Sequence, residues 1–206
     1  DAPGVIANQY IVVFNPEASR APVLRAEATV RQLGGEIQFS YGAAVIGFSV
    51  AIPAARLTTL RSLPGVAFVE PDRVGKIGTV QPPTPSGTPS SGIDRIDRRL
   101  LPRDFKYTYS ETGMAVRVYV FDTGVRHTHQ EFGGRAVHAA NFVNDGNGFD
   151  DCGGTGQGHG THMAGIIGGT TYGVAKNVSL HSVRVVPCNG LANLATVVAG
   201  VDWLTG

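Results

Sequence analysis

The sequence is poor in several features that define particular classes of protein. Its 206 residues include only two cysteines and one tryptophan, and they contain no run of eighteen apolar residues. Two cysteines permit one disulfide but cannot build a disulfide scaffold, and without an apolar run we expect no helix to span a membrane. Basic and acidic residues nearly balance, at 17 and 16, for a net charge of +1. This balance, without a basic stripe, argues against nucleic acid as the main partner.

What the sequence does contain indicates one or two packed domains of mixed α and β structure. Apolar residues make up 42% of the chain, which is enough for a sizeable core. The 28 glycines and 12 prolines favour tight turns over a helical bundle. The chain begins at Asp1 without a basic or apolar leader, so we expect any secretory signal to be absent or already removed.

A segment rich in proline, serine and glycine divides the chain. Residues 80–92, VQPPTPSGTPSSG, lack apolar periodicity and predict a linker. We therefore predict a first domain at 1–78, a junction at 79–92 and a second domain at 93–206. In the first domain, apolar patterns predict strands at 10–14, 36–41, 47–52 and 66–71 and helices at 22–33 and 54–63. This β-α-β-β-α-β order is that of a small α+β, ferredoxin-like fold.

The second domain alternates strands with helices. We predict strands at 114–121 and 178–186 and helices at about 159–168 and 193–204. Such alternation is typical of an α/β fold with a doubly wound parallel sheet, in which reactive groups gather at the carboxyl ends of the strands. Asp122, in the motif FDTGV, follows one such strand.

Asp122 has three interpretations at this point. It is a candidate catalytic carboxylate, and taken alone it is equally well explained as a turn aspartate that binds local backbone. Asp-Thr-Gly also carries the catalytic carboxylate of aspartic proteases, but a dyad of that kind needs two such tripeptides. The sequence contains one, so we set the aspartic protease aside.

His159 lies in the glycine-rich stretch GHGTHMAGIIGG at residues 158–169. An imidazole at a helix start, 37 residues after an aspartate at a strand end, suits a general base oriented by a carboxylate. Zinc binding by His159 and His162, or simple core packing, are the alternatives. Zinc is disfavoured because no third ligand falls at a standard spacing.

Together these motifs resemble a known family. VYVFDTGV followed by GHGTHMAG is similar to the aspartate and histidine motifs of the subtilisin-like serine proteases, and most similar to their proteinase K and aqualysin branch. Further stretches resemble that branch: GIDRIDRRLLP, EFGGRA, DCGG, TYGVAKNVSL, VRVVPCNG and VVAGVDWLTG. The resemblance covers residues 92–206. The first domain resembles the family's inhibitor prodomain through YIVVF, its element order and VAFVEPD before the linker.

The resemblance implies a secreted serine endopeptidase, in pro-form or nicked form, that hydrolyses peptide bonds of proteins. It makes Asp122 the aspartate of a Ser-His-Asp triad and His159 the general base. The family's nucleophilic serine lies in a GTSMA motif that these residues do not contain, and its oxyanion-hole asparagine also lies further along the family sequence. We therefore expect this chain alone to be inactive and its partner to be the remaining segment of the same protease.

The resemblance also gives the first domain two roles, as an assistant in folding and as an intramolecular inhibitor. The alternative from another class is a non-catalytic fragment, or a binding or chaperone module that has lost the nucleophile. Retention of both Asp122 and His159 favours the enzyme, because a purely structural role explains both residues poorly.

A substrate groove is a further implication of the resemblance. One edge would pair with an extended substrate, and one side chain would line a pocket. The edge comprises Asn189, Gly190, Leu191 and Ala192, and the pocket residue is Val186. A plain surface turn at Cys-Asn-Gly is the alternative for this segment. We expect residues 74–79 to lie extended along this edge as a product-like inhibitor.

The resemblance finally implies a disulfide and a metal. Cys152 and Cys188 match a pair that is disulfide-bonded in the aqualysin branch, so we expect them to be bonded. Calcium is the stabilising cofactor that the family most often uses, and its expected ligands here are Asp94, Asp97 and Asp104. A second possible calcium site in NFVNDGNGFDD comprises Asp145, Asp150 and Asp151. Solvated turn carboxylates explain that loop better.

Overall fold

The computed structural model describes residues 4–76, 91–97, 99–101, 106–153 and 158–206. The chain divides into two compact units. The first unit consists of Asp1–Ile77 together with Leu191–Gly206, and the second unit consists of Gly78–Gly190. Most of the predicted linker lies outside the described residues.

The first unit contains a five-stranded sheet in the order β2-β3-β1-β4-β8. Its strands are β1 (Val5–Phe14), β2 (Glu36–Tyr41), β3 (Gly47–Ala51), β4 (Val66–Lys76) and β8 (Leu191–Asn193). Its helices are α1 (Arg20–Gln32), the short pair η1 (Ala54–Arg56) and α2 (Leu57–Arg61), and α5 (Leu194–Thr205). All neighbouring strands pair antiparallel. In chain order, β1, α1, β2, β3, the η1–α2 pair and β4 follow the β-α-β-β-α-β order that the sequence predicts.

The core of the first unit lies between α1, α2 and one face of the sheet. Val23, Ala26 and Val30 are buried on α1 because their spacing of three and four residues places them on one side of the helix. They pack with Phe14, Phe48 and other buried residues of the strands. The helix ends before Gly35, where a Cβ would come within 2.7 Å of Val30 Cγ1. This glycine therefore permits the chain to return close to the helix.

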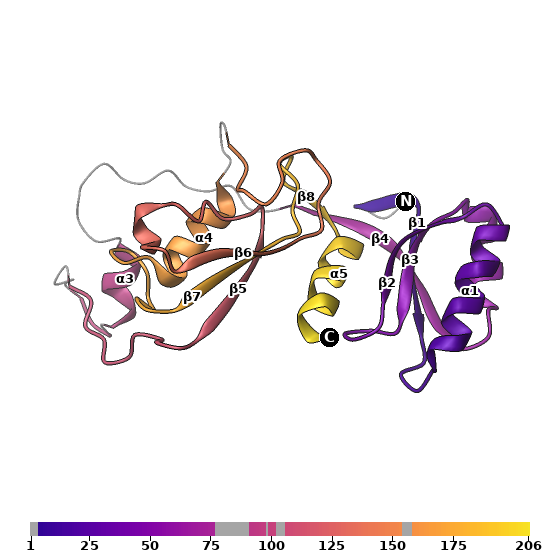
Figure 1. Cartoon of the computed structure of the whole chain (residues 1–206), viewed down its shortest axis with the longest axis horizontal. Helices are drawn as coiled ribbons and strands as arrows, with labels where there is room; N and C mark the ends of the chain where they lie inside the picture. Colours follow the sequence, from indigo (N-terminus) through magenta and orange to yellow (C-terminus); the bar gives the residue numbers. More distant parts are fainter. Residues whose placement is uncertain (1–3, 77–90, 98, 102–105, 154–157) are drawn as a thin grey trace. The chain divides into compact units, whose positions relative to one another are not determined.

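Helix α5 and strand β8 belong to the first unit, although the sequence groups them with the second domain. Figure 1 shows α5 on the side of the sheet opposite α1. At its first turn, the Ala195 N–H donates to the buried Asp72 carboxylate, at 3.2 Å. At its last turn, Asp202 accepts from the backbone N–H groups of residues 42–44 at 2.6 to 3.1 Å. Carboxylates thus hold both ends of this helix.

The second unit contains a parallel sheet in the order β5-β7-β6. Its strands are β5 (Arg117–Asp122), β6 (Ala136–Asn141) and β7 (Ser179–Arg184), and its helices are α3 (Ser91–Ile96), η2 (Gln130–Phe132) and α4 (His159–Gly168). Strand β6 was not predicted, because its sequence AVHAAN has neither an apolar run nor a clean alternation. Helix α4 packs so closely on β7 that a Cβ on Gly168 would meet Val178 and Leu180 side chains at 2.6 and 3.2 Å.

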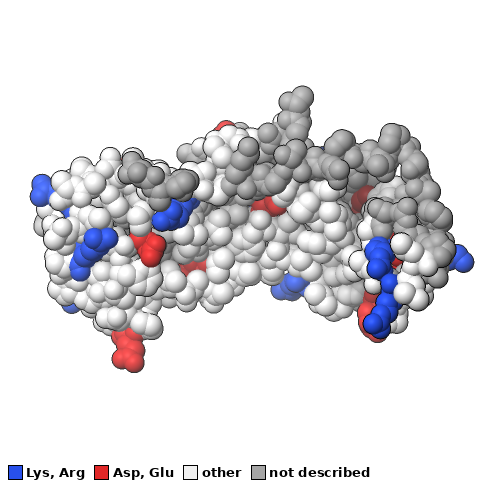
Figure 2. Space-filling model, turned by 180° about the vertical axis from the view of Figure 1, so that it is seen from behind, with Lys and Arg blue, Asp and Glu red and all other residues white. Residues whose placement is uncertain are grey.

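The surface of the described residues shows scattered charges. On the face drawn in Figure 2, basic and acidic side chains occur singly or in small groups, and the described residues form no continuous basic stripe there. None of the helices within the described ranges is long and apolar enough to cross a membrane.

Candidate active site

The aspartate and histidine singled out in the sequence meet in the second unit. Asp122 is the last residue of β5, and His159 is the first residue of α4. The His159 Nδ1 lies 2.8 Å from both Asp122 carboxylate oxygens. Asp122 is 7% exposed, so water competes little for its carboxylate. A carboxylate that accepts from Nδ1–H leaves Nε2 as the basic nitrogen, which is the tautomer that a general base needs.

Two glycines allow the strand end and the helix start to approach each other. A Cβ on Gly160 would lie 2.0 Å from the Gly124 carbonyl oxygen and 3.0 Å from the Asp122 Cβ. Gly124 adopts a φ of +111°, and a Cβ there would lie 2.5 Å from the Asp150 carbonyl oxygen. The glycine-rich pattern around Asp122 and His159 therefore has a geometric reason.

Asp151 connects the segments that carry the dyad, a role that its sequence motif does not predict. Its Oδ1 accepts from the Thr123 hydroxyl at 2.6 Å, and its Oδ2 accepts from the Thr161 N–H at 2.8 Å and from the Thr161 hydroxyl. The Thr123 hydroxyl in turn accepts from the Gly160 N–H at 3.0 Å. Asp151 is thus a structural hydrogen-bond acceptor and not a solvated turn carboxylate. The only sequence signal for this role is its place between two threonine-containing motifs.

An ion pair between a buried arginine and a more exposed aspartate supports the same strand ends. Arg184, at the end of β7, is completely buried and pairs with Asp145 at 2.7 and 2.8 Å. Its Nε also donates to the Thr123 carbonyl at 2.8 Å. The hydrogen bonds from Arg184, and to a smaller extent the Cys188 N–H, hold the pKa of Asp145 well below its usual range. Sequence reasoning missed Arg184, because an arginine at the end of an apolar strand gives no sign of burial.

The expected disulfide is present between Cys152 and Cys188. It links the loop before α4 to the segment after β7, so it closes the region around the dyad covalently. Cys152 and Cys188 also lie within reach of Asp145 as a group of side chains that could bind a metal. We exclude a metal there because the thiols are oxidised and Asp145 neutralises Arg184.

The expected substrate-binding residues fall in both units. In the second unit, Val186 is buried and its N–H donates to the Asp122 carbonyl at 3.2 Å. Asn189 lies in a turn closed by the Gly190 N–H and the Pro187 carbonyl, at 2.9 Å, which agrees locally with the alternative of a turn.

In the first unit, Leu191 and Ala192 lie in β8, which pairs antiparallel with the chain's own β4. The partners are Lys76 with Leu191, Gly75 with Ala192 and Val74 with Asn193. The expected segment 74–79 is therefore paired with this edge through residue 76, and residues 77–79 lie outside the described ranges. The role of the edge in binding substrates stays a prediction.

The expected calcium ligands are only partly described. Asp94 is buried in α3, and the Asp97 carboxylate accepts from the Thr108 N–H at 2.5 Å. Asp104 lies outside the described residues. Among the described residues, neither Asp94 nor Asp97 belongs to a group of three or more potential ligands close enough to share one ion.

Comparison with known families identifies both parts of the chain. Residues 113–205 match the subtilase family, and residues 9–77 match the family of peptidase inhibitors I9. Residues 113–205 therefore belong to the subtilase family. The subtilase match includes β8 and α5, although in the structure these two elements belong to the first unit, together with the residues that match the inhibitor family. The α/β fold of the second unit and the α+β fold of the first agree with this assignment.

Named relatives support the assignment. The chain is 42% identical over its full length to an extracellular serine proteinase of Thermus sp. (strain Rt41A), and it covers 52% of that protein. It is 40% identical over 97% of its length to an alkaline serine exoprotease A of Vibrio alginolyticus, of which it covers 38%. The chain thus spans about half the length, or less, of these relatives.

Solved structures show the same fold. A cold-adapted subtilisin-like serine proteinase is 47% identical and matches 57% of this chain and 42% of its own, with a TM-score of 0.52. Fervidolysin from Fervidobacterium pennivorans matches 98% of this chain and 34% of its own with a TM-score of 0.67. Its identity is only 19%, so it supports the fold alone.

Proposed function

We propose that this chain is the inhibitor-containing part of a secreted subtilisin-like serine endopeptidase, in which Asp122 and His159 are two members of the catalytic triad. The observation that carries the proposal is the 2.8 Å contact between His159 Nδ1 and the Asp122 carboxylate, within the residues that match the subtilase family. Secretion is supported by the extracellular relative from Thermus and by the disulfide, which persists in oxidising surroundings.

The third member of the triad is a serine, which belongs to a segment of the protease that these 206 residues do not contain. Asp122 fixes the imidazole so that Nε2 takes the proton of the serine hydroxyl as the serine attacks the peptide carbonyl. His159 then returns this proton to the leaving amine, and the carboxylate stabilises the imidazolium between the two steps. The Thr123, Asp151 and Thr161 contacts hold the strand end and helix start at the required separation.

The direct test uses the protein with its serine-bearing segment and a fluorogenic peptide substrate. His159→Ala is expected to lower kcat by about 10⁴-fold or more, because the serine loses its base. The matched control is His162→Gln, which removes an exposed imidazole from the same helix and should leave kcat unchanged. Comparable turnover in His159→Ala and the parent enzyme would refute the assignment of the base.

We also propose that β4 acts as an inhibitory strand. Its residues 74–76 add to the sheet edge at Leu191–Asn193 in the manner of an extended peptide. This is the edge that the family resemblance assigns to the substrate, so the chain's own segment would exclude substrate from it.

Gly75 offers a matched pair of variants for this second proposal. A Cβ on Gly75 meets nothing within 4 Å, so Gly75→Ala keeps the strand, whereas Gly75→Pro removes a backbone donor and restricts φ. In the full protein, we expect Gly75→Pro to increase amide exchange at Leu191–Asn193 and to raise peptidase activity before the inhibitor domain is released. Equal exchange and equal activity in the proline and alanine variants would contradict the inhibitory strand.

Calcium at Asp94, Asp97 and Asp104 is a separate proposal about stability. Carboxylate oxygens are suitable ligands for this ion, and the buried position of Asp94 supports a role inside the fold. Added calcium should raise the Tm of the parent protein and leave that of Asp97→Asn unchanged. A Tm that does not respond to calcium in the parent would exclude the site.

A further inference from the structure

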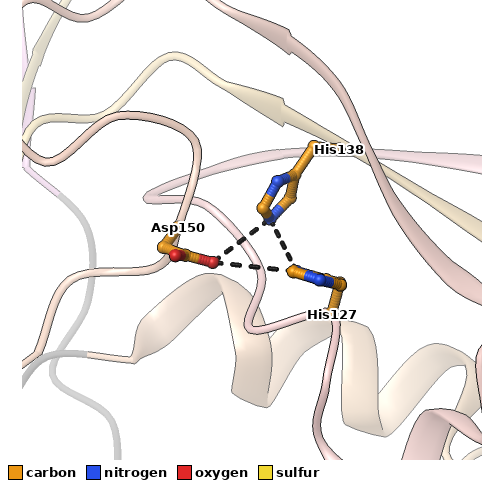
Figure 3. A group of neighbouring side chains, drawn as sticks. All are labelled: His127, His138 and Asp150. Atoms are coloured by element: carbon orange, nitrogen blue, oxygen red, sulfur yellow. Dashed lines mark hydrogen bonds and ion pairs between the residues drawn. The ribbon is translucent and has the colours of Figure 1, made fainter.

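Two histidines and one aspartate outside the dyad come together in the second unit. His127 lies in the turns after β5, His138 lies in β6, and Asp150 lies in the loop between β6 and α4. Figure 3 shows that the three side chains point toward a common centre. The sequence motifs offer zinc only as an alternative at His159 and His162. His127, His138 and Asp150 are 11 and 12 residues apart, which is no standard ligand spacing, so no sequence pattern marks them as a group.

The distances within the group suit a tetrahedral metal ion. His127 Nδ1 lies 3.1 Å from His138 Nε2 and 3.7 Å from Asp150 Oδ1, and His138 Nε2 lies 3.3 Å from Asp150 Oδ1. Ligands about 2.0–2.1 Å from a tetrahedral zinc ion are separated from each other by about 3.3–3.4 Å. The three donor atoms therefore already have nearly the separations that one such ion requires.

One imidazole nitrogen of the group, His138 Nε2, has more polar neighbours than it can hydrogen-bond to at once. His138 Nε2 lies close to three polar atoms, namely His127 Nδ1, the Val125 carbonyl oxygen at 3.2 Å and Asp150 Oδ1. A neutral imidazole nitrogen carries at most one proton, which can serve only one of them well. A cation at the centre would instead accept electron pairs from both imidazoles and from the carboxylate.

Two members of the group, His138 and Asp150, are held by further contacts. The His138 ring stacks on Phe149, with centroids 5.7 Å apart and planes 16° apart. The Asp150 carbonyl accepts from the Asn147 side chain at 2.8 Å, and Gly124 leaves room for this part of the loop. The side chains of His127 and His138 are 44% and 24% exposed, so an ion and a water molecule can reach them.

We propose that His127, His138 and Asp150 form a binding site for a divalent transition metal ion of the zinc class, with water as the remaining ligand. Two imidazoles and one carboxylate favour such an ion over calcium, which prefers oxygen ligands alone. The site goes beyond the proposed peptidase function and does not depend on it. Asp150 directly precedes Asp151, which accepts hydrogen bonds from Thr123 and Thr161. A bound ion would therefore also restrict the motion of the loop that carries Asp151.

The test is calorimetric titration of the metal-free chain with ZnCl₂, and in parallel with CaCl₂. We expect one zinc ion per chain, bound with higher affinity than calcium, and a visible absorption of tetrahedral type when Co²⁺ replaces zinc. Asp150→Asn and His127→Gln should each lower zinc affinity by about tenfold or more. His162→Gln is the matched control and should bind like the parent, because it removes an exposed histidine that is not part of the group.

Several outcomes would overturn the site. These are an absence of zinc binding, equal affinity in the parent and both ligand variants, or a loss of binding in His162→Gln. Preference for calcium over zinc would point to a carboxylate site instead. His127 and Asp150 are exposed enough for both substitutions to be tolerated, and circular dichroism of the metal-free variants verifies that they fold like the parent.

Discussion

In the first unit, eleven buried apolar residues from the strands and two helices form a single core, whereas the cluster described in the second unit has seven. The second unit adds the Arg184–Asp145 pair, the Asp151 hydrogen bonds and the disulfide. Interactions around the dyad thus also stabilise the second unit. In the second unit, the same contacts therefore serve both stability and the geometry of the dyad.

The largest effect is expected from the apolar core of the first unit. Phe48 is completely buried against Phe14, and Phe48→Ala should lower the free energy of unfolding by about 3–5 kcal/mol. Fluorescence of Trp203, the one tryptophan and part of α5, follows this unit during urea denaturation. Phe68→Ala, at a side chain that is half exposed, is the control and should cost much less. A loss below about 1 kcal/mol in Phe48→Ala would contradict the core's importance.

The disulfide gives the corresponding test of the second unit. Replacing both Cys152 and Cys188 by serine removes a link between residues 36 positions apart. The chain-entropy model gives a loss of roughly 3 to 4 kcal/mol for a loop of this length. Hydrogen exchange in β5 and β7 should increase, while the Trp203 signal of the first unit stays unchanged. The parent protein after reduction serves as the control and should behave like the double variant.

The ion pair should show a somewhat smaller cost and a defined dependence on pH. Asp145→Asn leaves the buried Arg184 without its counter-charge, and we expect a loss of about 3 kcal/mol. Because the folded state lowers the Asp145 pKa below 3.8, the pair stabilises the fold above that pH, and this contribution disappears as the pH falls toward the lowered pKa.

To check this prediction, the stability of the second unit is measured by hydrogen exchange in urea at a series of pH values decreasing from 5. The loss of stability should begin near pH 3.8, roughly the ordinary pKa of an aspartate, and grow at lower pH. The acid-dependent loss should be smaller in Asp145→Asn than in the parent. Glu111→Gln, at an exposed carboxylate of the same unit, is the control for removal of a negative charge. The same acid slope in Asp145→Asn and the parent would rule out a special contribution of the pair.

The smallest effect concerns the contact between α5 and the sheet of the first unit. The Tyr41 hydroxyl donates to the Ala195 carbonyl at 3.2 Å, so Tyr41→Phe should cost about 1 kcal/mol. Burial is the main cause that raises the pKa of Tyr41 from 10.0 to about 12. The protonated form is therefore favoured in the folded state, and stability should decrease as the pH rises from 10 to about 12.

Urea denaturation followed by circular dichroism at pH 9, 10 and 11 measures this alkaline loss of stability. These values cover roughly the lower half of the range between the ordinary and the raised pKa of Tyr41. Tyr41→Phe should flatten the dependence. Tyr109→Phe removes an exposed tyrosine from the second unit and is the control. An unchanged alkaline slope in Tyr41→Phe would show that another group causes it.

Elements with strong local signals agree closely between sequence and structure. Helix α4 was predicted at about 159–168 and occupies His159–Gly168, and α1 begins and ends within two residues of its prediction. The sequence does not predict strands β6 and β8, because one is mixed in polarity and the other is only three residues long. They form strands because they pair with β7 and β4. The contact of Asp122 with His159 was expected from their motifs, whereas the Asp151 contacts arise from a loop whose course no local pattern indicates.

The sequence by itself determined the apolar periodicity of the main elements, the glycines around the dyad and the motifs that identify the family. These properties depend on residues close together in the chain, so they can be recognised before the fold is known. Only the tertiary structure decided that α5 packs on the sheet of the first unit, that Arg184 is buried against Asp145, and that His127, His138 and Asp150 share one centre. The physical reason is that burial and side-chain distances depend on segments far apart in sequence, which only folding brings together.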